Sequence, residues 1–142
     1  MGREWLAEVI VVDTSAIVAM AFGEPEREAF LQAIQRAEKA LISTVSVVEA
    51  RMVVHGRRGQ RAVLLMDDLL RLPVFEMIAP GVAETEAAYS AFVTFGKGSG
   101  HLAALNFGDL FSYALAKVRG LPLLYKGDDF SQTDVINALT AV

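Results

Sequence analysis

The sequence predicts one α/β domain built on a mostly parallel sheet, and three observations lead to this expectation. Short apolar runs typical of buried strands alternate with stretches of helical character. Hydrophobic residues make up 54% of the 142 residues and charged residues only 21%, a balance typical of strands that helices cover on both faces. No repeat, low-complexity segment or linker divides the chain, so residues 1–142 are expected to form a single domain.

The first half of the chain predicts two strands and four helices. Residues 8–13 form a mostly β-branched run that ends in a carboxylate, as expected of a fully buried strand. Thr14 and Ser15 offer an N-cap for a short apolar helix at 16–22, which Gly23 ends. The other elements expected here are a helix to about residue 38, a strand at 40–43, a helix capped by Thr44 or Ser46 that runs to about residue 55, and, after a break at 56–59, a helix that Pro73 ends.

The second half predicts two further strands, at 74–78 and 122–125. Pro80 and Gly81 turn the chain into an Ala-rich helix, and a glycine-rich loop around Lys97 follows it. The remaining expectations are a helix at 109–119, a turn at 127–130 and a tail at 134–142 with room for a fifth short strand. Because the strands alternate with helices, the crossovers between them should be right-handed.

Charge and cysteine content exclude several classes of protein. The chain has 13 basic and 17 acidic residues, so it lacks a long-range positive field, and any contact with nucleic acid must use local patches. It has no cysteine, which excludes disulfide frameworks, thiolate metal sites and cysteine nucleophiles. Its two histidines leave little room for a His-rich metal site. The most apolar stretch, at 9–22, is too short to span a membrane and is interrupted by polar residues. We therefore expect a soluble, cytoplasmic protein without membrane contact.

Acidic residues interrupt apolar sequence at element boundaries. Asp13 ends the first strand, Glu49 lies in a helix that is apolar on nearly every side, and Asp109 begins the penultimate helix. Asp128 and Asp129 follow the fourth strand. The carboxyl ends of parallel strands share one edge of a sheet, and ligands bind there at the switch in strand order. If the first and fourth strands are neighbours at that switch, Asp13 and Asp129 face each other, and Glu49 and Asp109 can join them.

Such a cluster predicts a divalent cation. Carboxylates that share one pocket repel one another, and their pKa values rise unless a positive charge compensates. Mg²⁺ and Mn²⁺ prefer oxygen ligands; they make water a usable nucleophile near neutral pH, and a second metal can hold the leaving oxygen of a phosphodiester. Thr14 and Ser15 are then expected to donate hydrogen bonds that fix Asp13.

Each acidic residue also has a purely structural explanation. Asp109 lies three residues after Asn106, which fits an N3 acid behind an Asn N-cap. Asp128 and Asp129 beside Gly127 fit an ordinary turn. The corresponding explanations for the other two are the end of a strand for Asp13 and an ion pair with Arg51 or Arg57 for Glu49. The acids together, at matching positions along one sheet edge, are a stronger indication than any one of them.

Basic residues are few but locally clustered. Arg57, Arg58 and Arg61 lie beside the helix that carries Glu49. The cluster is interpreted either as a contact to phosphate groups or as a solvated turn between two helices. Lys126, beside the acidic turn, is a weaker candidate for phosphate contact.

Four segments, 11–16, 43–49, 105–116 and 124–130, occur in an order and spacing that resemble the PIN-domain ribonucleases. More narrowly, they resemble the VapC-like toxins of bacterial and archaeal toxin–antitoxin modules, and the match covers nearly the whole chain. A strand that ends in Asp is common among α/β proteins. The helix start at 106–109 (Asn-Phe-Gly-Asp) and the turn at 127–130 (Gly-Asp-Asp-Phe) are the specific parts of the resemblance.

The resemblance implies a three-layer α/β/α fold and RNA cleavage that depends on Mg²⁺ or Mn²⁺. The family's four catalytic and metal-binding acids correspond to Asp13, Glu49, Asp109 and Asp129. The positions expected to support them are Thr14, Ser15, Asn106 and Asp128, and the candidates for RNA contact are Arg57, Arg58, Arg61 and Lys126. Because the family's last acid directly precedes the Phe, Asp128 is an extra carboxylate whose role stays open.

The resemblance also implies partners. Proteins of this kind typically form dimers and are inhibited by a small antitoxin encoded beside them. We therefore expect a symmetric homodimer and a groove near residues 30–34 and 45–54 that accepts an apolar antitoxin helix. A basic antitoxin side chain would reach Glu49 and Asp13, displace the cation and block the RNA path. The alternative is that these apolar residues all belong to the core.

Three other classes of protein remain as alternatives. A phosphoacceptor receiver domain has a pair of acids near its first strand, where this chain offers only Asp13. A haloacid-dehalogenase-type phosphatase has a second Asp two residues after the first, where this chain has Ser15. The third alternative is a non-catalytic binding module on the same fold, and the intact carboxylates argue against it.

Overall fold

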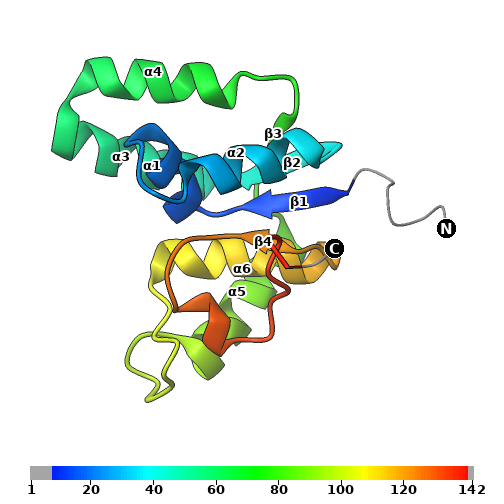
Figure 1. The fold of residues 1–142 in the computed structure, drawn as a ribbon. Helices are drawn as coiled ribbons and strands as arrows, with labels where there is room; N and C mark the ends of the chain where they lie inside the picture. The colour runs from blue at the N-terminus through cyan, green and yellow to red at the C-terminus, as the bar shows by residue number, and fades with distance from the viewer. Residues whose placement is uncertain (1–7, 141–142) are drawn as a thin grey trace, which may run out of the picture.

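The structure of the protein, a computed structural model, describes residues 8–140 (Figure 1). Strands and helices alternate along this part of the chain. The strands are β1 (Val9–Val12), β2 (Lys39–Ser43), β3 (Phe75–Ile78) and β4 (Leu123–Leu124). The helices are α1 (Thr14–Ala21), α2 (Arg27–Arg36), α3 (Thr44–Arg58), α4 (Gln60–Leu70), α5 (Val82–Phe95), α6 (Phe107–Arg119) and the short 3-10 helix η2 (Phe130–Gln132). Across the described residues, no helix combines the length and the apolar character needed to cross a lipid bilayer.

The strands form one parallel sheet in the order β3-β2-β1-β4. Val11 of β1 pairs with Leu41 of β2 on one side and with Leu123 of β4 on the other. The strand order therefore reverses between β1 and β4, which meets the condition under which Asp13 and Asp129 were expected to share one edge of the sheet. The backbone N–H of Asp13 donates to the carbonyl of Leu124 at 2.9 Å and holds the carboxyl ends of the two strands together.

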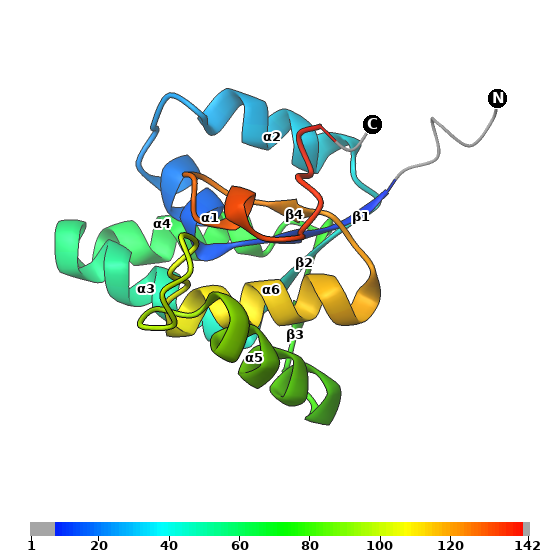
Figure 2. The ribbon, with the colours of Figure 1, turned by 90° about the horizontal axis from the view of Figure 1, so that it is seen from below.

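Helices cover both faces of the sheet, which confirms the expected three-layer α/β/α fold (Figures 1 and 2). Side chains of a strand alternate between faces. Ile10 and Val12 pack into a core shared with α1 to α4, whereas Val11 packs into the core on the other face with α5 and α6. The strands β1 and β4 are apolar throughout and largely buried between the two layers, and β2 is buried after Lys39. The edge strand β3 is only partly buried and includes Glu76. Helix α6 runs back from the carboxyl edge of the sheet, so its first turn lies at that edge, next to the starts of α1 and α3.

Two helices begin one or more residues earlier than the sequence predicts. The N-cap of α1 is Asp13, not Thr14 or Ser15, because its carboxylate accepts the backbone N–H of Ser15 at 2.9 Å. The N-cap of α3 is Ser43, whose hydroxyl accepts the N–H of Val45 at 3.2 Å. Ser43 is the last residue of β2, and Asp13 directly follows β1, so each strand joins its helix without a loop.

The expected break at 56–59 and the expected fifth strand were also wrong in part. Helix α3 continues through Arg58, and only Gly59, with φ of +81°, interrupts it. In the tail, Leu123 donates to the carbonyl of Ile136 and accepts from Ala138, but this pairing stays a single bridge in the part of the tail that the structure describes. Residues 141 and 142 of the predicted strand lie outside the described residues.

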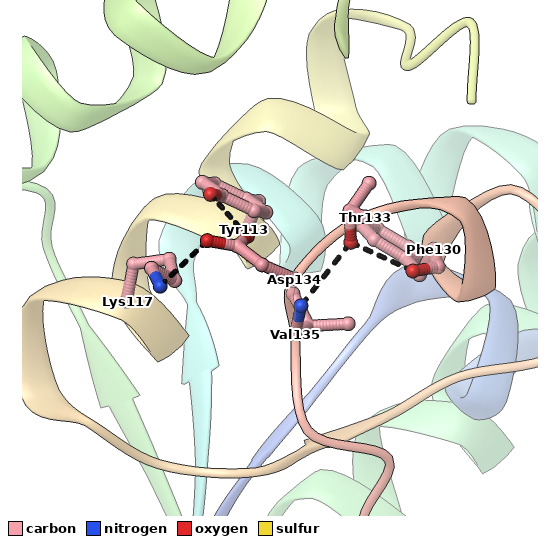
Figure 3. Close-up of polar contacts among 6 residues, drawn as sticks. All are labelled: Tyr113, Lys117, Phe130, Thr133, Asp134 and Val135. Atoms are coloured by element: carbon pink, nitrogen blue, oxygen red, sulfur yellow. Dashed lines mark hydrogen bonds and ion pairs between the residues drawn. The ribbon is translucent and has the colours of Figure 1, made fainter. Parts of the chain in front are cut away.

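The tail is attached to α6 by side chains (Figure 3). The hydroxyl of Tyr113 donates to Asp134 Oδ1 at 2.6 Å, and Lys117 Nζ donates to Asp134 Oδ2 at 2.9 Å. Burial alone would raise the pKa of Asp134, but these hydrogen bonds and the charge of Lys117 lower it on balance. These two hydrogen bonds attach the segment that follows the turn at 127–130 to α6.

Candidate active site

The first turns of α1, α3 and α6 meet at the carboxyl edge of the sheet. The hydroxyl of Thr14 on α1 donates to the carbonyl of Ser46 on α3 at 3.3 Å. The hydroxyl of Ser46 lies 3.1 Å from that of Ser112 on α6. Free backbone N–H groups at helix N-termini favour negative charge nearby. This edge is therefore the place in the fold best suited to hold clustered carboxylates.

Asp13 is the buried centre of the site, with a side chain only 1% exposed. Its Oδ2 accepts from the backbone N–H and the hydroxyl of Ser15, at 2.9 and 2.6 Å. Its Oδ1 is buried and has no hydrogen-bond partner among the described residues. Burial raises the pKa of Asp13, although the hydroxyls of Ser112 and Ser15 oppose the rise. A buried, half-satisfied carboxylate of this kind has an oxygen available for a positively charged ligand.

Asp109 serves both as a helix cap and as a member of the acidic cluster. Its Oδ2 accepts the N–H of Asn106 at 3.0 Å, and its own N–H donates to Asn106 Oδ1 at 2.9 Å. This capping box confirms the structural explanation and also fixes the carboxylate in place. Burial, and then the charges of Asp13, Glu49 and Asp129, raise the pKa of Asp109 to about 7. Asp109 is therefore close enough to the other three predicted acids for their charges to raise its pKa.

Glu49 lies on α3, half-buried, with its carboxylate against Gly108 of α6. The ion-pair explanation does not hold for either arginine. Arg51 Nε donates instead to Asp67 at 3.1 Å, and the Arg57 guanidinium lies over the ring of Phe22. Glu49 thus faces the acidic cluster rather than these cations.

The two acids of the turn at 127–130 differ in what they influence. Both are exposed. Asp129 contributes to the raised pKa of Asp109. The charge of Asp128 acts instead on Tyr125, whose pKa is raised first by burial and then by this carboxylate. Of the pair, Asp129 is the one directed at the cluster.

The residues expected to hold the acids in place differ in what they contact. Ser15 and Asn106 hydrogen-bond to Asp13 and Asp109 as expected. The hydroxyl of Thr14 does not fix Asp13, because it donates to Ser46. Lys126 donates its backbone N–H to the Ser15 hydroxyl at 2.9 Å, and its Nζ pairs with Glu24 at 2.8 Å and Glu26 at 3.4 Å.

The basic cluster lies along a different surface. The guanidinium carbons of Arg57 and Arg58 lie 5.4 and 4.4 Å from the centre of the Phe22 ring. Arg58 and Arg61 also line a groove of about 500 Å³ between α1, α2, α3 and α4. Leu31 and Val54 line it too, at the two segments where the sequence predicts an antitoxin groove.

Three contributors to the site were not predicted: Ser46, Ser112 and Gly108. The first two form a buried hydroxyl pair between residues 66 positions apart, which periodicity does not indicate. Gly108 lies within the specific motif at 106–109. A glycine at the second position of a helix is unusual, and this could have indicated that another group lies against the helix there.

The donor set fits a hard divalent cation. Carboxylate oxygens are the ligands that Mg²⁺ and Mn²⁺ prefer, and the unpartnered Oδ1 of Asp13 offers one of them. Across residues 8–140, no three acidic or imidazole side chains already have the spacing for direct coordination of one ion. Mg²⁺ usually retains several waters and is bound through one or two carboxylates, so the chemistry of these acids still fits it.

A three-layer α/β/α domain with clustered acids at the switch of a parallel sheet defines the class of this protein. Residues 10–136 match the PIN domain family. The chain is 42% identical over 126 residues to VapC ribonuclease Mb0640 of Mycobacterium bovis and to ribonuclease VapC30 of Mycobacterium tuberculosis, which covers 89% of this chain and 95% of each relative. Ribonuclease VapC42 of Mycobacterium tuberculosis is 39% identical over 131 residues, 92% of this chain and 100% of the relative. The chain belongs to the PIN-domain family, among its VapC ribonucleases.

Solved structures show the same fold. Mycobacterium tuberculosis VapC20, described as a toxin that cleaves the sarcin–ricin loop, matches with a TM-score of 0.73 at 19% identity, over 89% of this chain and 96% of that chain. VapBC2 from Rickettsia felis, bound to a DNA fragment from its promoter, matches with a TM-score of 0.71 at 15% identity, over 91% of this chain and 96% of that chain.

Proposed function

We propose that this protein is a Mg²⁺- or Mn²⁺-dependent endoribonuclease that acts as the toxin of a toxin–antitoxin pair. One observation carries the proposal. The pKa of Asp109 rises to about 7 because it is buried and because Asp13, Glu49 and Asp129 are close enough to act on it. Clustered groups with perturbed pKa values in one site are typical of catalytic centres. The identity to VapC ribonucleases supports RNA as the substrate.

Each acid has a distinct part in this proposal. Asp13, fixed through Oδ2 by Ser15, would offer its Oδ1 to the cation. Asp109, held by Asn106, would bind it as a carboxylate, so its proton would be lost on binding. Glu49 on α3 and Asp129 in the exposed turn would supply the remaining protein ligands. A bound cation of this kind supplies an activated water near neutral pH and stabilises charge on the leaving oxygen.

The substrate must reach an acidic pocket on an acidic protein. We retain Arg57, Arg58, Arg61 and Lys126 as candidates for RNA contact. The ion pairs of Lys126 with Glu24 and Glu26 mean that a phosphate group would have to compete with two carboxylates for it. An RNA substrate is consistent with a cytoplasmic location.

A small antitoxin is the proposed partner. The groove between α1 and α4 supports this assignment, because its walls combine Leu31, Leu65 and Leu69 with the cations Arg27, Arg58 and Arg61. Such a groove suits an amphipathic helix. A protein of the same fold from Klebsiella pneumoniae is described as part of a toxin–antitoxin complex. A basic antitoxin side chain that reaches Glu49 and Asp13 would compete with the cation.

A homodimer is the second proposed assembly. Helix α5 exposes Val82, Tyr89, Phe92 and Val93, with exposed fractions between 46% and 81%. A row of large apolar side chains on one helix is typical of an interface. Light scattering coupled to size-exclusion chromatography checks this proposal, and a strict monomer at high micromolar concentration contradicts it.

The activity is tested by incubation of the purified protein with unpaired and structured RNA in Mg²⁺, Mn²⁺ or EDTA. We expect internal cleavage with either cation, none with EDTA, and none from Asp109→Asn. Acetyl phosphate and a phosphomonoester are the matched substrates for the receiver and phosphatase alternatives. Turnover of these in place of RNA would overturn the proposal.

A further inference from the structure

Gly108 lies against the side chain of Glu49, where the two helices that carry acidic residues of the site pack together. It is the second residue of α6 and is buried. The carboxylate of Glu49 on α3 lies where the side chain of residue 108 would be. A Cβ at this position would overlap Cδ and both carboxylate oxygens of Glu49. The added Cβ would be attached to the backbone of α6, which is held in place by the helix. The side chain of Glu49 would therefore have to move.

The contact is part of a seam between α3 and α6. Ser46 precedes Glu49 by three positions, and Ser112 follows Gly108 by four, so each pair lies on one helix face. The hydroxyls of Ser46 and Ser112 meet at 3.1 Å, and both side chains are fully buried. Two small residues and one glycine thus bring the helices together in a fixed register, with Glu49 at the end nearest Asp109.

We propose that Gly108 is a positioning residue, which leaves space for the Glu49 carboxylate and thereby sets its place beside Asp109. Glycine in a helix is disfavoured relative to alanine, and its φ here is not in the left-handed region. The space that it leaves is therefore the reason for glycine at this position. The steric part stands on the geometry alone, whereas the role of Glu49 as a ligand rests on the proposed function.

The steric part is tested on the metal-free protein by a double-mutant cycle. Gly108→Ala is made in the wild type and in Glu49→Ala, with Gly56→Ala as the control, because a Cβ at Gly56 in α3 would meet nothing within 4 Å. We expect Gly56→Ala to raise Tm by up to about 4 °C. In the wild type the Glu49 side chain must move aside, so Gly108→Ala should raise Tm less than Gly56→Ala does, or lower it, whereas in Glu49→Ala it should raise Tm as Gly56→Ala does. The same change in Tm in both backgrounds would overturn the proposal.

The ligand part is tested by Mn²⁺ titration, followed by electron paramagnetic resonance of free Mn²⁺. Displacement of Glu49 by Gly108→Ala should weaken binding by about tenfold or more, with at most a twofold change for Gly56→Ala. Within Glu49→Ala, Gly108→Ala should leave the remaining affinity unchanged. Wild-type affinity in Gly108→Ala would overturn the positioning role.

Two further outcomes are decisive. If Gly108→Ala fails to fold but the double variant folds, the collision with Glu49 is confirmed. If both fail to fold, the glycine serves the packing of α6 itself and the proposal is wrong. A wild type that binds no Mn²⁺ contradicts the proposed function, while the Tm cycle still decides the steric claim.

Discussion

The hydroxyl of Ser15 accepts a hydrogen bond from the backbone N–H of Lys126 at 2.9 Å, across 111 positions of the chain. The same hydroxyl donates to the carboxylate of Asp13 at 2.6 Å. One small side chain thus connects the acid that follows β1 to the segment that follows β4. Because the two strands are neighbours at the switch of the sheet, this bridge sets the distance between Asp13 and the acidic turn.

Replacement of this hydroxyl tests the bridge. Ser15→Ala leaves the N–H of Lys126 without its partner and removes one of the two hydrogen bonds to Asp13 Oδ2, and we expect a loss of about 1–3 kcal/mol in the free energy of unfolding. Mn²⁺ affinity should fall about 10- to 100-fold, as for other groups that orient a ligand. Ser99→Ala, which removes an exposed hydroxyl bonded only to the N–H of His101, is the control. Equal behaviour of the two variants would contradict the bridge.

Neutralisation of single acids separates activity from stability. Asp13→Asn and Asp109→Asn should abolish metal-dependent RNA cleavage, because each removes a ligand charge. In metal-free protein their Tm should hold or rise, because each change also relieves repulsion or burial of charge. Asp68→Asn, which breaks an exposed pair with Arg71 at 2.9 Å, should retain activity. Full ribonuclease activity in both site variants would refute the assignment of the site.

The raised pKa of Asp109 predicts how stability depends on pH. Folding raises the pKa from 3.8 to about 7, so the folded state binds the proton more tightly than the unfolded state. The stabilisation is complete below the unfolded pKa and is lost as pH rises toward 7, by at most about 1.4 kcal/mol for each pH unit. Urea denaturation of metal-free protein between pH 4 and pH 8 should show this fall in wild type relative to Asp109→Asn. A constant difference between the two proteins would contradict the pKa.

Much of the fold was predictable because its signals are local. Continuous apolar runs indicate the central strands of a doubly covered sheet. The strand order was left open, because the sequence only permits β1 and β4 to be neighbours, as the structure shows them to be. The helix boundaries were less predictable. Asp13 and Ser43 cap α1 and α3 from the strand side, and buried Val54, with Arg58 against Phe22, keeps α3 helical through Gly56.

That these four acids lie near one another was predictable, since a carboxylate in apolar sequence is costly without a role. What holds them was not. The Ser46–Ser112 pair joins helices from distant parts of the chain, and the space at Gly108 has meaning only once Glu49 is beside it. Such contacts depend on how α3 and α6 pack, and no periodicity within either helix encodes that arrangement.

The arginine cluster gives a prediction about substrate binding. In an Asp109→Asn background that does not cleave, alanine at Arg57, Arg58 and Arg61 should weaken RNA binding for all sequences and lower the salt slope by up to about one unit for each arginine. Fluorescence anisotropy at several salt concentrations measures both. Unchanged affinity and slope would assign these side chains to the Phe22 contact and the groove instead.

The most direct test of the acidic cluster as a metal site is calorimetric titration of Mn²⁺ into the protein near pH 6.5, in buffers of different ionisation enthalpy. Because Asp109 is largely protonated below its pKa of about 7, binding should release on the order of one proton. That release should decrease as the pH is raised to 8.5. Asp109→Asn should release fewer protons and bind Mn²⁺ more weakly, with any remaining release coming from the buried Asp13. Binding without proton release at pH 6.5, or equal affinity in Asp109→Asn, would contradict the site.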